Sequence, residues 1–359
     1  MALPFLNGFS RKKRSHMMAV DLGSRTSKAI LLERRGEDLA MTRFAVVDAP
    51  IYDKRMSPEL LADHLRQVSD ALGSTTKSLA LTMGLEDVIV RPVELPQIPV
   101  NEMRLVLKNN SKVYLQQDLP NHVFDCHIFP AKAPAAGRPP EAARTVGVTR
   151  TRVLAAAAKK QLVEDMQSAA KSAGLALECL APGLISPVNA FELAMAKEFA
   201  DETVALVDVG FKHSSICVLD HGELALTRMV NIGGDKLTAG LAESMNISYA
   251  EAEGIKVGMA PEVQSTLETL VSPLGRELRA SLDFFEHQQD RPVTQIFVGG
   301  GSARSEMILQ MLHTEMLADC KTWNPTGFLR LELPGQQMVE IEHVGSQLAV
   351  AIGAALAAL

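Results

Sequence analysis

The sequence has few cysteines and no apolar run long enough to cross a membrane. Its four cysteines, Cys126, Cys179, Cys217 and Cys320, are scattered without a CxxC pair, so neither a zinc site nor a disulfide framework is indicated. We expect them to be reduced and mostly buried, in a cytoplasmic protein. The longest apolar stretch, LAVAIGAALAAL at 348–359, is well short of the roughly 18 residues of a spanning helix.

An excess of positive charge is also missing. The net charge of −6 gives no sign of general binding to nucleic acid. Hydrophobic residues make up 47% and charged residues 22% of the chain, which is typical of an ordinary globular protein. A chain of 359 residues is too long for one compact core, so we expect two or more domains.

The first 16 residues, MALPFLNGFSRKKRSH, predict a flexible basic tail. Apolar residues precede the basic cluster, whereas a secretory signal has the opposite order. Two interpretations stay open at this point. The segment is either a tail without contacts or a weak, reversible anchor to anionic lipid, where each basic residue contributes on the order of 1 kcal/mol.

Two stretches of the chain repeat one pattern. AVDLGSRTSKAILLE at 19–33 is similar to ALVDVGFKHSSICVLD at 205–220, and GEDLAMTR at 36–43 is similar to GELALTR at 222–228. A shift of 187 positions superposes Val20, Asp21, Gly23, Ser27 and Leu32 on Val207, Asp208, Gly210, Ser214 and Leu219. Each copy reads as strand, polar turn, strand, glycine turn, strand. The repeat therefore predicts two domains of one fold, each beginning with a β-meander that carries an aspartate at its first turn.

Other segments fit this division. SPELLADHLRQVSDAL at 57–72 predicts a helix with Ser57 as its N-cap, and 101–117 predicts another. AKAPAAGRPPEAA at 131–143 predicts an exposed loop. Residues from about 100 to 175 exceed what a repeat of the second half needs, so they predict an inserted subdomain.

A third glycine-rich element is QIFVGGGSARSEMILQMLH at 295–313, which predicts a strand, three glycines and a helix beginning near Ser302. Such a junction lets backbone N–H groups approach a ligand without obstruction by Cβ atoms. No GK[ST] follows, so it is not a Walker loop. Arg304 stands where a dinucleotide fingerprint has its last glycine.

Together, the three elements predict a nucleotide site between two domains. The two turns would hold the β- and γ-phosphates of ATP through backbone N–H groups and hydroxyls, at Gly23, Ser24, Ser27, Gly210, Ser214 and Ser215. Asp21 and Asp208 would repel the phosphates without a cation, so we expect them to hold Mg²⁺. Lys28 either contacts phosphate or only keeps its strand solvated as a solvent-facing side chain. The base would lie against Gly299, Gly300, Gly301 and Ser302.

DLGSRTSK, DVGFKHSS and FVGGGSAR resemble the phosphate-1, phosphate-2 and adenosine motifs of the actin/Hsp70/sugar-kinase ATPases. Within that group, VIVRPVELP at 88–96, AAKKQLVEDMQSAAKSAGL at 157–175 and NIGGDKLTAGLAESMNISYAEAEGIKVG at 231–258 resemble the PilM family of type IV pilus assembly and its relative FtsA. The resemblance implies that the cleft is lined by Gly233, Gly234 and Asp235, and that Glu253 and Lys256 reach the ribose and base. By spacing alone, Glu253 and Lys256 could equally be a solvated surface pair.

The resemblance implies an α/β actin-like ATPase fold, with two duplicated RNase H-like domains around a nucleotide cleft. Domain I would span 17–200, with a 1C-type subdomain inserted at about 100–175. Domain II would span 201–340, and a C-terminal helix at 341–359 would return to domain I. Phe211, Lys212 and His213 make the second phosphate loop bulky, and we find no residue to position a water. We therefore expect at most a slow ATPase.

Three function classes follow from these features. The first is an ATP-binding scaffold of a type IV pilus or related secretion platform, at the inner face of the cytoplasmic membrane. It would bind the cytoplasmic tail of a PilN-like bitopic membrane protein between the insertion and domain I, and self-association is possible. The second is a sugar-type kinase, which needs a carboxylate base that we do not find. The third is an FtsA-like division protein. FtsA usually ends in a basic amphipathic helix, whereas this chain stops at Leu359 in its last domain helix.

Overall fold

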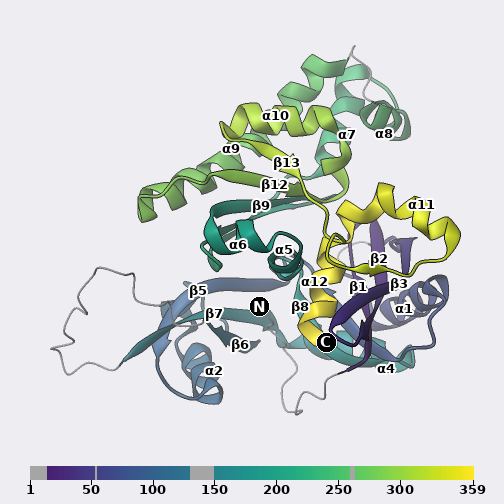
Figure 1. Ribbon diagram of the computed structural model, residues 1–359. Helices are drawn as coiled ribbons and strands as arrows, with labels where there is room; N and C mark the ends of the chain where they lie inside the picture. The colour runs from purple at the N-terminus through teal and green to yellow at the C-terminus, as the bar shows by residue number, and fades with distance from the viewer. Residues whose placement is uncertain (1–13, 53–54, 130–148, 259–262) are drawn as a thin grey trace.

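The computed structural model describes residues 14–52, 55–129, 149–258 and 263–359. Most of the predicted N-terminal tail and the whole predicted loop at 131–143 lie outside these residues. The predicted tail extends to residue 16, but His16 is already the first residue of strand β1 (His16–Asp21). Figure 1 shows domain II at the top, domain I at the lower right and a smaller sheet at the lower left.

Domain I contains a six-stranded sheet of order β14-β3-β2-β1-β4-β8. The strands besides β1 are β2 (Thr26–Arg35), β3 (Asp38–Asp48), β4 (Ser78–Met83), β8 (Ala176–Pro182) and β14 (Arg330–Leu331). Helices α1 (Pro58–Leu72) and α4 (Lys160–Ser172) pack against each other, and α5 (Ser186–Ala194) and α6 (Ala196–Asp201) lead to domain II. Ser57 caps α1 by accepting a hydrogen bond from the N–H of Leu60, as predicted.

Domain II contains a five-stranded sheet of order β11-β10-β9-β12-β13. Its strands are β9 (Thr203–Val209), β10 (Ser214–Asp220), β11 (Glu223–Val230), β12 (Gln295–Gly299) and β13 (Cys320–Thr322). Its helices are α7 (Gly234–Met245), α8 (Tyr249–Gly258), α9 (Gln264–Gln289) and α10 (Glu306–Met316).

The two sheets share one topology, which confirms the predicted duplication. Each begins with three antiparallel strands, and the first strand of each pairs in parallel with a later one, β1 with β4 and β9 with β12. The register also shifts at the same place in both meanders, between Leu31 and Leu32 and between Val218 and Leu219. These positions are related by the same offset of 187, so even the bulge is duplicated.

The insertion is a three-stranded sheet of order β5-β7-β6. It comprises β5 (Val88–Pro96), α2 (Val100–Asn109), α3 (Ser111–Tyr114), β6 (His122–Ile128) and β7 (Arg150–Lys159). Its boundaries therefore differ from the predicted range of about 100–175. Strand β5 pairs with β7 in the small sheet, whereas α4 packs on α1 and β8 pairs with β4 in domain I. The helix predicted at 101–117 is divided at Asn110.

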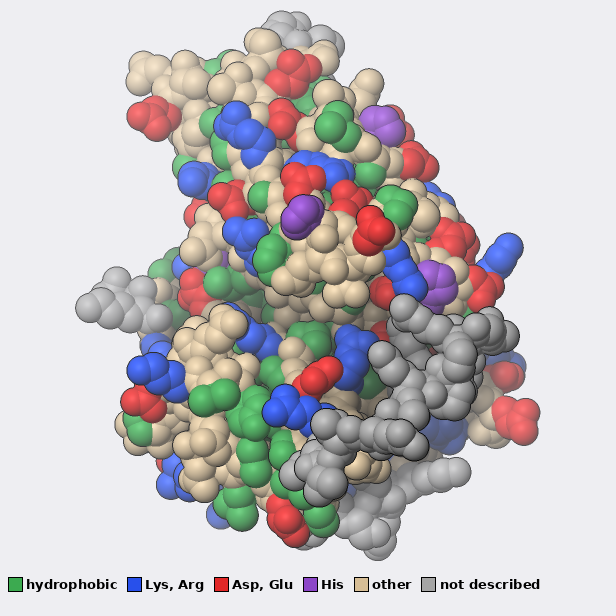
Figure 2. Space-filling model, turned by 90° about the vertical axis from the view of Figure 1, so that its left-hand side faces the viewer, with side chains coloured by type: hydrophobic (Ala, Val, Ile, Leu, Met, Phe, Trp, Pro, Cys, Tyr) green, Lys and Arg blue, Asp and Glu red, His purple; other side chains and the backbone are tan. Residues whose placement is uncertain are grey.

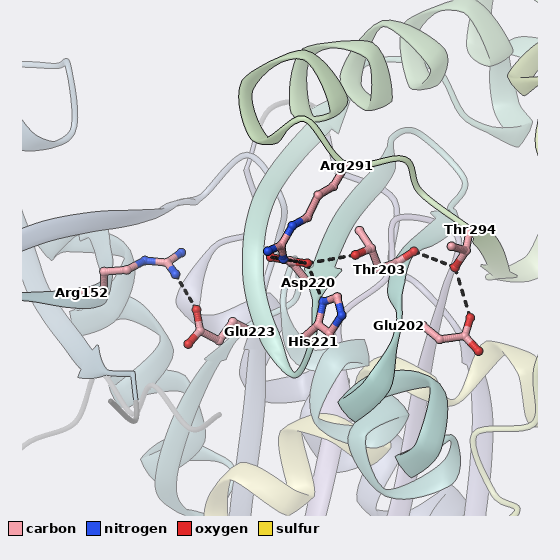
Figure 3. Close-up of polar contacts among 8 residues, drawn as sticks. All are labelled: Arg152, Glu202, Thr203, Asp220, His221, Glu223, Arg291 and Thr294. Atoms are coloured by element: carbon pink, nitrogen blue, oxygen red, sulfur yellow. Dashed lines mark hydrogen bonds and ion pairs between the residues drawn. The ribbon is translucent and has the colours of Figure 1, made fainter. Parts of the chain in front are cut away.

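The insertion also contacts domain II. The Thr227 hydroxyl of β11 donates to the carbonyl of Val90 in β5 over 2.9 Å, and Arg152 of β7 forms an ion pair with Glu223 at the start of β11 (Figure 3). Both contacts lie along β11, the edge strand of the domain II sheet. The insertion therefore continues from domain I along the chain and contacts domain II through β11.

The C-terminal segment returns to domain I earlier than predicted. Strand β14 pairs with β3, and α11 (Gly335–Val344), η3 (Gly345–Gln347) and α12 (Ala349–Ala358) follow. The single helix predicted at 341–359 is thus interrupted, and α12 packs on β1 and α5. Among the described residues no single helix has the length and composition of a membrane span, and α11–η3 with α12 passes that test only as a pair bent by 88°.

Gly353 controls the approach of α12 to α5. A Cβ atom there would lie 1.7 Å from the carbonyl oxygen of Ser186, and the Asn189 side chain donates to the Gly353 carbonyl over 3.0 Å. We expect Gly353→Ala to lower the free energy of unfolding by about 1–3 kcal/mol through overpacking, measured by urea denaturation. The control is Gly345→Ala, where no atom lies within 4 Å of the added Cβ. Equal stability of the two variants would contradict this account of the packing.

Candidate functional site

A cavity of about 700 Å³ lies between the two copied turns. It is lined by β1 and its turn from domain I, by β9 and its turn from domain II, and by the glycine-rich junction after β12. Most of the predicted site residues line it: Asp21, Gly23, Ser24, Ser27, Lys28, Asp208, Gly210, Ser215, Gly234, Glu253, Lys256, Gly300, Gly301 and Ser302. Residues from distant parts of the chain thus meet in one space.

Asp21 and Asp208 occupy equivalent positions near the ends of the first strands of the two meanders. Asp21 accepts a hydrogen bond from the Thr82 hydroxyl over 3.2 Å, and Lys28 Nζ lies 3.6 Å from its other oxygen. Burial, together with the negative charge of Asp21, raises the pKa of Asp208 to about 6, and the charge of Lys28 only partly opposes this. The Asp208 carboxyl group is therefore buried close to a second carboxylate in the cavity wall.

The two turns require glycine for the same steric reason. A Cβ on Gly23 would lie 2.4 Å from the carbonyl oxygen of Thr26, and one on Gly210 would lie 2.6 Å from that of His213. These pairs are related by the offset of 187. The Gly210 N–H donates to His213 over 3.1 Å, which closes the second turn. Each turn is therefore tight, and its backbone is exposed to the cavity.

The glycine junction after β12 packs directly on the second aspartate. Gly300 has φ of +88°, and a Cβ there would lie 2.7 Å from an Asp208 carboxylate oxygen. The helix predicted near Ser302 begins later, because residues Gly301–Arg304 form a 3₁₀ turn (η2) and Ser305 caps α10. Gly301 has more space, with only the Gln347 side chain 3.9 Å from an added Cβ.

Glu253 and Lys256 form part of the cavity wall. Lys256 is only 7% exposed, and its Nζ donates to Glu253 over 2.7 Å and to the Thr238 hydroxyl over 2.7 Å. Burial opposes the ionisation of Glu253, but the hydrogen bonds from Lys256 and Thr238 outweigh it and lower the pKa of Glu253. The interpretation as a solvated surface pair is therefore wrong.

Several predicted residues have other partners. The Ser27 hydroxyl is buried and shares a hydrogen bond of 2.7 Å with His64 Nε2, and Ser214 donates to the Ile232 carbonyl over 2.7 Å. Asp235 accepts from the Tyr249 hydroxyl over 2.7 Å. Four predicted residues do not line the cavity: Ser214, Gly233, Asp235 and Gly299. Of the four predicted hydroxyls, Ser24 and Ser215 line it without a hydrogen bond to another part of the wall among those described.

Some residues of the site were missed from the sequence. Arg25 lies inside the first motif and reaches Glu253 in domain II. Thr82 orients Asp21 and Thr238 orients Glu253, but each stands in an ordinary strand or helix pattern. Only Arg25 had a signal, because it is a cation within a turn of otherwise small and polar residues.

The cavity extends to the base of the insertion. Methionines and leucines line this part, which we call the apolar lobe: Met56, Leu61, Met83, Leu85, Leu162 and Met166. Arg55 and Asp165 form an ion pair of 2.9 Å in its wall. Asp87 also lines the lobe, and burial raises the pKa of its carboxyl group despite the nearby Arg55 and Lys159. Within the described residues, no three His, Cys, Asp or Glu side chains gather as a complete metal site.

Asp208 gives the ligand-free protein a defined pH dependence. Its pKa is about 6 in the folded protein and 3.8 ordinarily, so the folded state binds more protons between these values. The free energy of unfolding therefore falls as pH rises through this window and stays reduced above it. We expect Asp208→Asn to gain about 1–3 kcal/mol relative to the wild type between pH 4 and pH 7.5.

This is measured by urea denaturation without nucleotide or divalent cation. The exposed Asp38 at the start of β3 supplies the control, since Asp38→Asn makes the same change outside the cavity. A difference between Asp208→Asn and the wild type that does not change with pH would contradict the assignment.

Comparisons with known proteins agree with this geometry. The family described as "Type IV pilus assembly protein PilM" matches residues 19–359. Cell division protein FtsA of Bacillus subtilis (strain 168) is 26% identical over 149 residues, which are 40% of this chain and about a third (32%) of that protein.

Three solved structures are similar in fold. A PilM–PilN type IV pilus biogenesis complex is 20% identical, with 97% of this chain and 99% of that chain covered and a TM-score of 0.80. MreB5 of Spiroplasma citri bound to ADP is 10% identical, with 95% of each chain covered and a TM-score of 0.53. Ethanolamine utilization protein EutJ of Carboxydothermus hydrogenoformans is 15% identical, with 97% and 91% covered and a TM-score of 0.52. These structures confirm the actin-like ATPase fold, and the family match shows that this chain belongs to the PilM family of type IV pilus assembly proteins.

Proposed function

We propose that this protein is an ATP-binding scaffold of a type IV pilus or related secretion platform, at the cytoplasmic face of the inner membrane. The observation that carries the proposal is the cavity between the two copied turns, with Asp21 and Asp208 in its wall. MreB5, which has the same fold, has been solved with ADP and with AMPPNP. Membrane contact would be indirect, through a partner, or weak, through the N-terminal tail.

Mg²⁺ suits the two carboxylates. A hydrated magnesium ion is commonly held by one or two carboxylates together with phosphate oxygens. Burial, and after it the negative charge of Asp21, raises the pKa of Asp208, and a divalent ion held by the two carboxylates would offset their repulsion. Lys28, Ser24 and Ser215 would hold the phosphates, while the N–H groups of Gly23 and Gly210 donate within their own turns, to the carbonyls of Asp21 and His213.

The other wall would hold the nucleoside. Glu253 and Lys256 would reach the ribose and base, and Gly301 and Ser302 would lie against the base. Ser27, Ser214 and Asp235 would instead support the walls through the hydrogen bonds described above. We propose slow or negligible hydrolysis, because Phe211, Lys212 and His213 make the second turn bulky and because we assign no residue in the described part of the cavity wall to orient a water.

The nucleotide site is tested by carboxylate removal. We expect Asp21→Ala and Asp208→Ala each to weaken Mg·ATP binding about tenfold or more, equivalent to about 1.4 kcal/mol, with a smaller effect on ADP without metal. Calorimetry measures both affinities, with exposed Asp38→Ala as the matched control. Wild-type affinity in both variants would contradict the cleft site.

The wild type and these two variants also test whether the protein catalyses ATP hydrolysis or phosphoryl transfer. Turnover well above roughly 1 s⁻¹ would mean that a catalytic group was overlooked. Phosphorylation of a sugar or small alcohol would move the protein to the kinase class, with Asp87 as the carboxylate to examine. Gly301→Val tests the proposed contact with the base. Gly300→Val is less suitable, because a side chain at that position would also distort β9.

The apolar lobe suits a peptide from the cytoplasmic tail of a PilN-like membrane protein. The related complex contains PilN together with PilM. The lobe lies where the insertion joins domain I, and its methionines can adapt to an apolar side chain. Leu105, Val113 and Ile128 are exposed on the insertion, and Figure 2 shows hydrophobic side chains gathered over the lower half of the molecule, where the insertion lies.

Met56 offers the sharpest test of the lobe. It is half-buried at the lobe, so Met56→Glu places a charge there without breaking the core. We expect at least a tenfold loss of affinity for the partner peptide, about 1.4 kcal/mol, with Mg·ATP affinity retained. The matched control is Met338→Glu, because Met338 is 41% exposed on α11. Full peptide binding by Met56→Glu would exclude the lobe. Deletion of the insertion with α4 would be uninformative, because α4 belongs to the core of domain I.

A further inference from the structure

Arg25 connects the two domains across the mouth of the cavity. It follows Ser24 in the first turn, and its Nη1 lies 2.7 Å from Glu253 Oε1 on α8. Its guanidinium group also lies over the ring of Phe211 in the second turn, 5.4 Å from the ring centre. One side chain of the first turn therefore touches both the second turn and the acid expected to hold the ribose.

The ion pair is well placed to be exchanged for another anion. Arg25 is 46% exposed, and an exposed ion pair adds little to stability. Glu253 keeps Lys256 and Thr238 at its other oxygen if Arg25 leaves, so it is not left as an unpaired buried charge. A guanidinium group binds a phosphate group through two parallel hydrogen bonds, which is stronger than a single exposed contact to a carboxylate.

We propose that Arg25 recognises the terminal phosphate of ATP and thereby distinguishes ATP from ADP. The inference rests on the proposed nucleotide site. Without nucleotide, Arg25 ties domain I to domain II through Glu253. When a nucleoside takes Glu253, the guanidinium group is released beside the two turns, which are expected to enclose the outermost phosphates. Cation–π contact with Phe211 keeps it between the turns.

This assigns a purpose to the bulky second turn. A small residue at position 211 would leave the guanidinium group without a surface to rest on. Phe211 lines the cavity together with Arg25, so the two side chains form one unit from opposite domains. The same unit links the phosphate state to the relative position of the domains.

The test compares ATP and ADP affinities, both with Mg²⁺, in Arg25→Ala, Arg25→Lys and the wild type. We expect Arg25→Ala to weaken ATP binding about tenfold or more and ADP binding less than about threefold, with Arg25→Lys between the two. Lysine keeps the charge but loses the paired hydrogen bonds. Equal losses for ATP and ADP, or no loss for either, would overturn the proposal.

Arg152→Ala is the matched control. Arg152 also pairs with a glutamate of domain II, Glu223, but it does not line the cavity (Figure 3). It should leave the ratio of ATP to ADP affinity unchanged, and an equal shift of that ratio would count against a phosphate contact at Arg25. If the wild type binds neither ATP nor ADP, the proposed function itself is wrong. If the wild type binds both but Arg25→Ala leaves the ratio of ATP to ADP affinity unchanged, only this inference is wrong.

Discussion

Two like charges, Asp21 and Asp208, are held in one cavity, and the arrangement around them follows from that constraint. Each aspartate lies near the end of the first strand of a meander, so the sheets fix both carboxylates. The residue opposite Asp21 in the neighbouring strand is Lys28, whereas the residue opposite Asp208 is Ser215. The two copies therefore share the aspartate but differ in the residue opposite it. Burial and the charge of Asp21 raise the pKa of Asp208, and the charge of Lys28, which stands opposite the other aspartate, only partly opposes them.

The two domains are joined on both sides of that cavity by polar contacts. At its mouth, Arg25 pairs with Glu253, and His213 Nε2 lies 3.0 Å from Glu86. Away from it, Arg152 pairs with Glu223. Exposed pairs of this kind are each worth roughly 0–1 kcal/mol, so they orient the domains without locking them. A ligand that contacts both walls can therefore change the domain angle at a small cost in free energy.

Much of the fold could be predicted because its signals are local or repeated. The offset of 187 predicted the duplicated meanders, and Ser57 with Pro58 predicted the start of α1. The roles of individual hydroxyls could not be predicted in the same way. Ser27 and Ser24 are close in sequence and both line the cavity, but the Ser27 hydroxyl is already hydrogen-bonded to His64 on α1. Asp235 likewise meets Tyr249, which begins the next helix. Such partners depend on how helices pack, which no local pattern records.

The predicted boundary of the insertion was wrong for a related reason. The observed extent of the insertion determines which domain it contacts. The strand Val88–Pro96 resembles any strand of domain I until its partner, β7, is known. Because β5 belongs to the insertion, the contact between Val90 and Thr227 joins the insertion directly to domain II.

The domain II end of that connection is hydrogen-bonded to the rest of its own domain. At the hairpin between β10 and β11, Asp220 accepts hydrogen bonds from Arg291 and Thr203 (Figure 3). Burial disfavours its charge, yet the hydrogen bonds from His221, Thr203 and Arg291 prevail and lower the pKa of Asp220. The hairpin is therefore fastened to its own domain, and Glu223 next to it holds Arg152 of the insertion. A rotation of domain II about the nucleotide cavity would carry this hairpin with it and pull on the insertion. Because the apolar lobe lies at the base of the insertion, the same rotation would reshape the lobe, and by reciprocity an occupant of the lobe would bias the rotation.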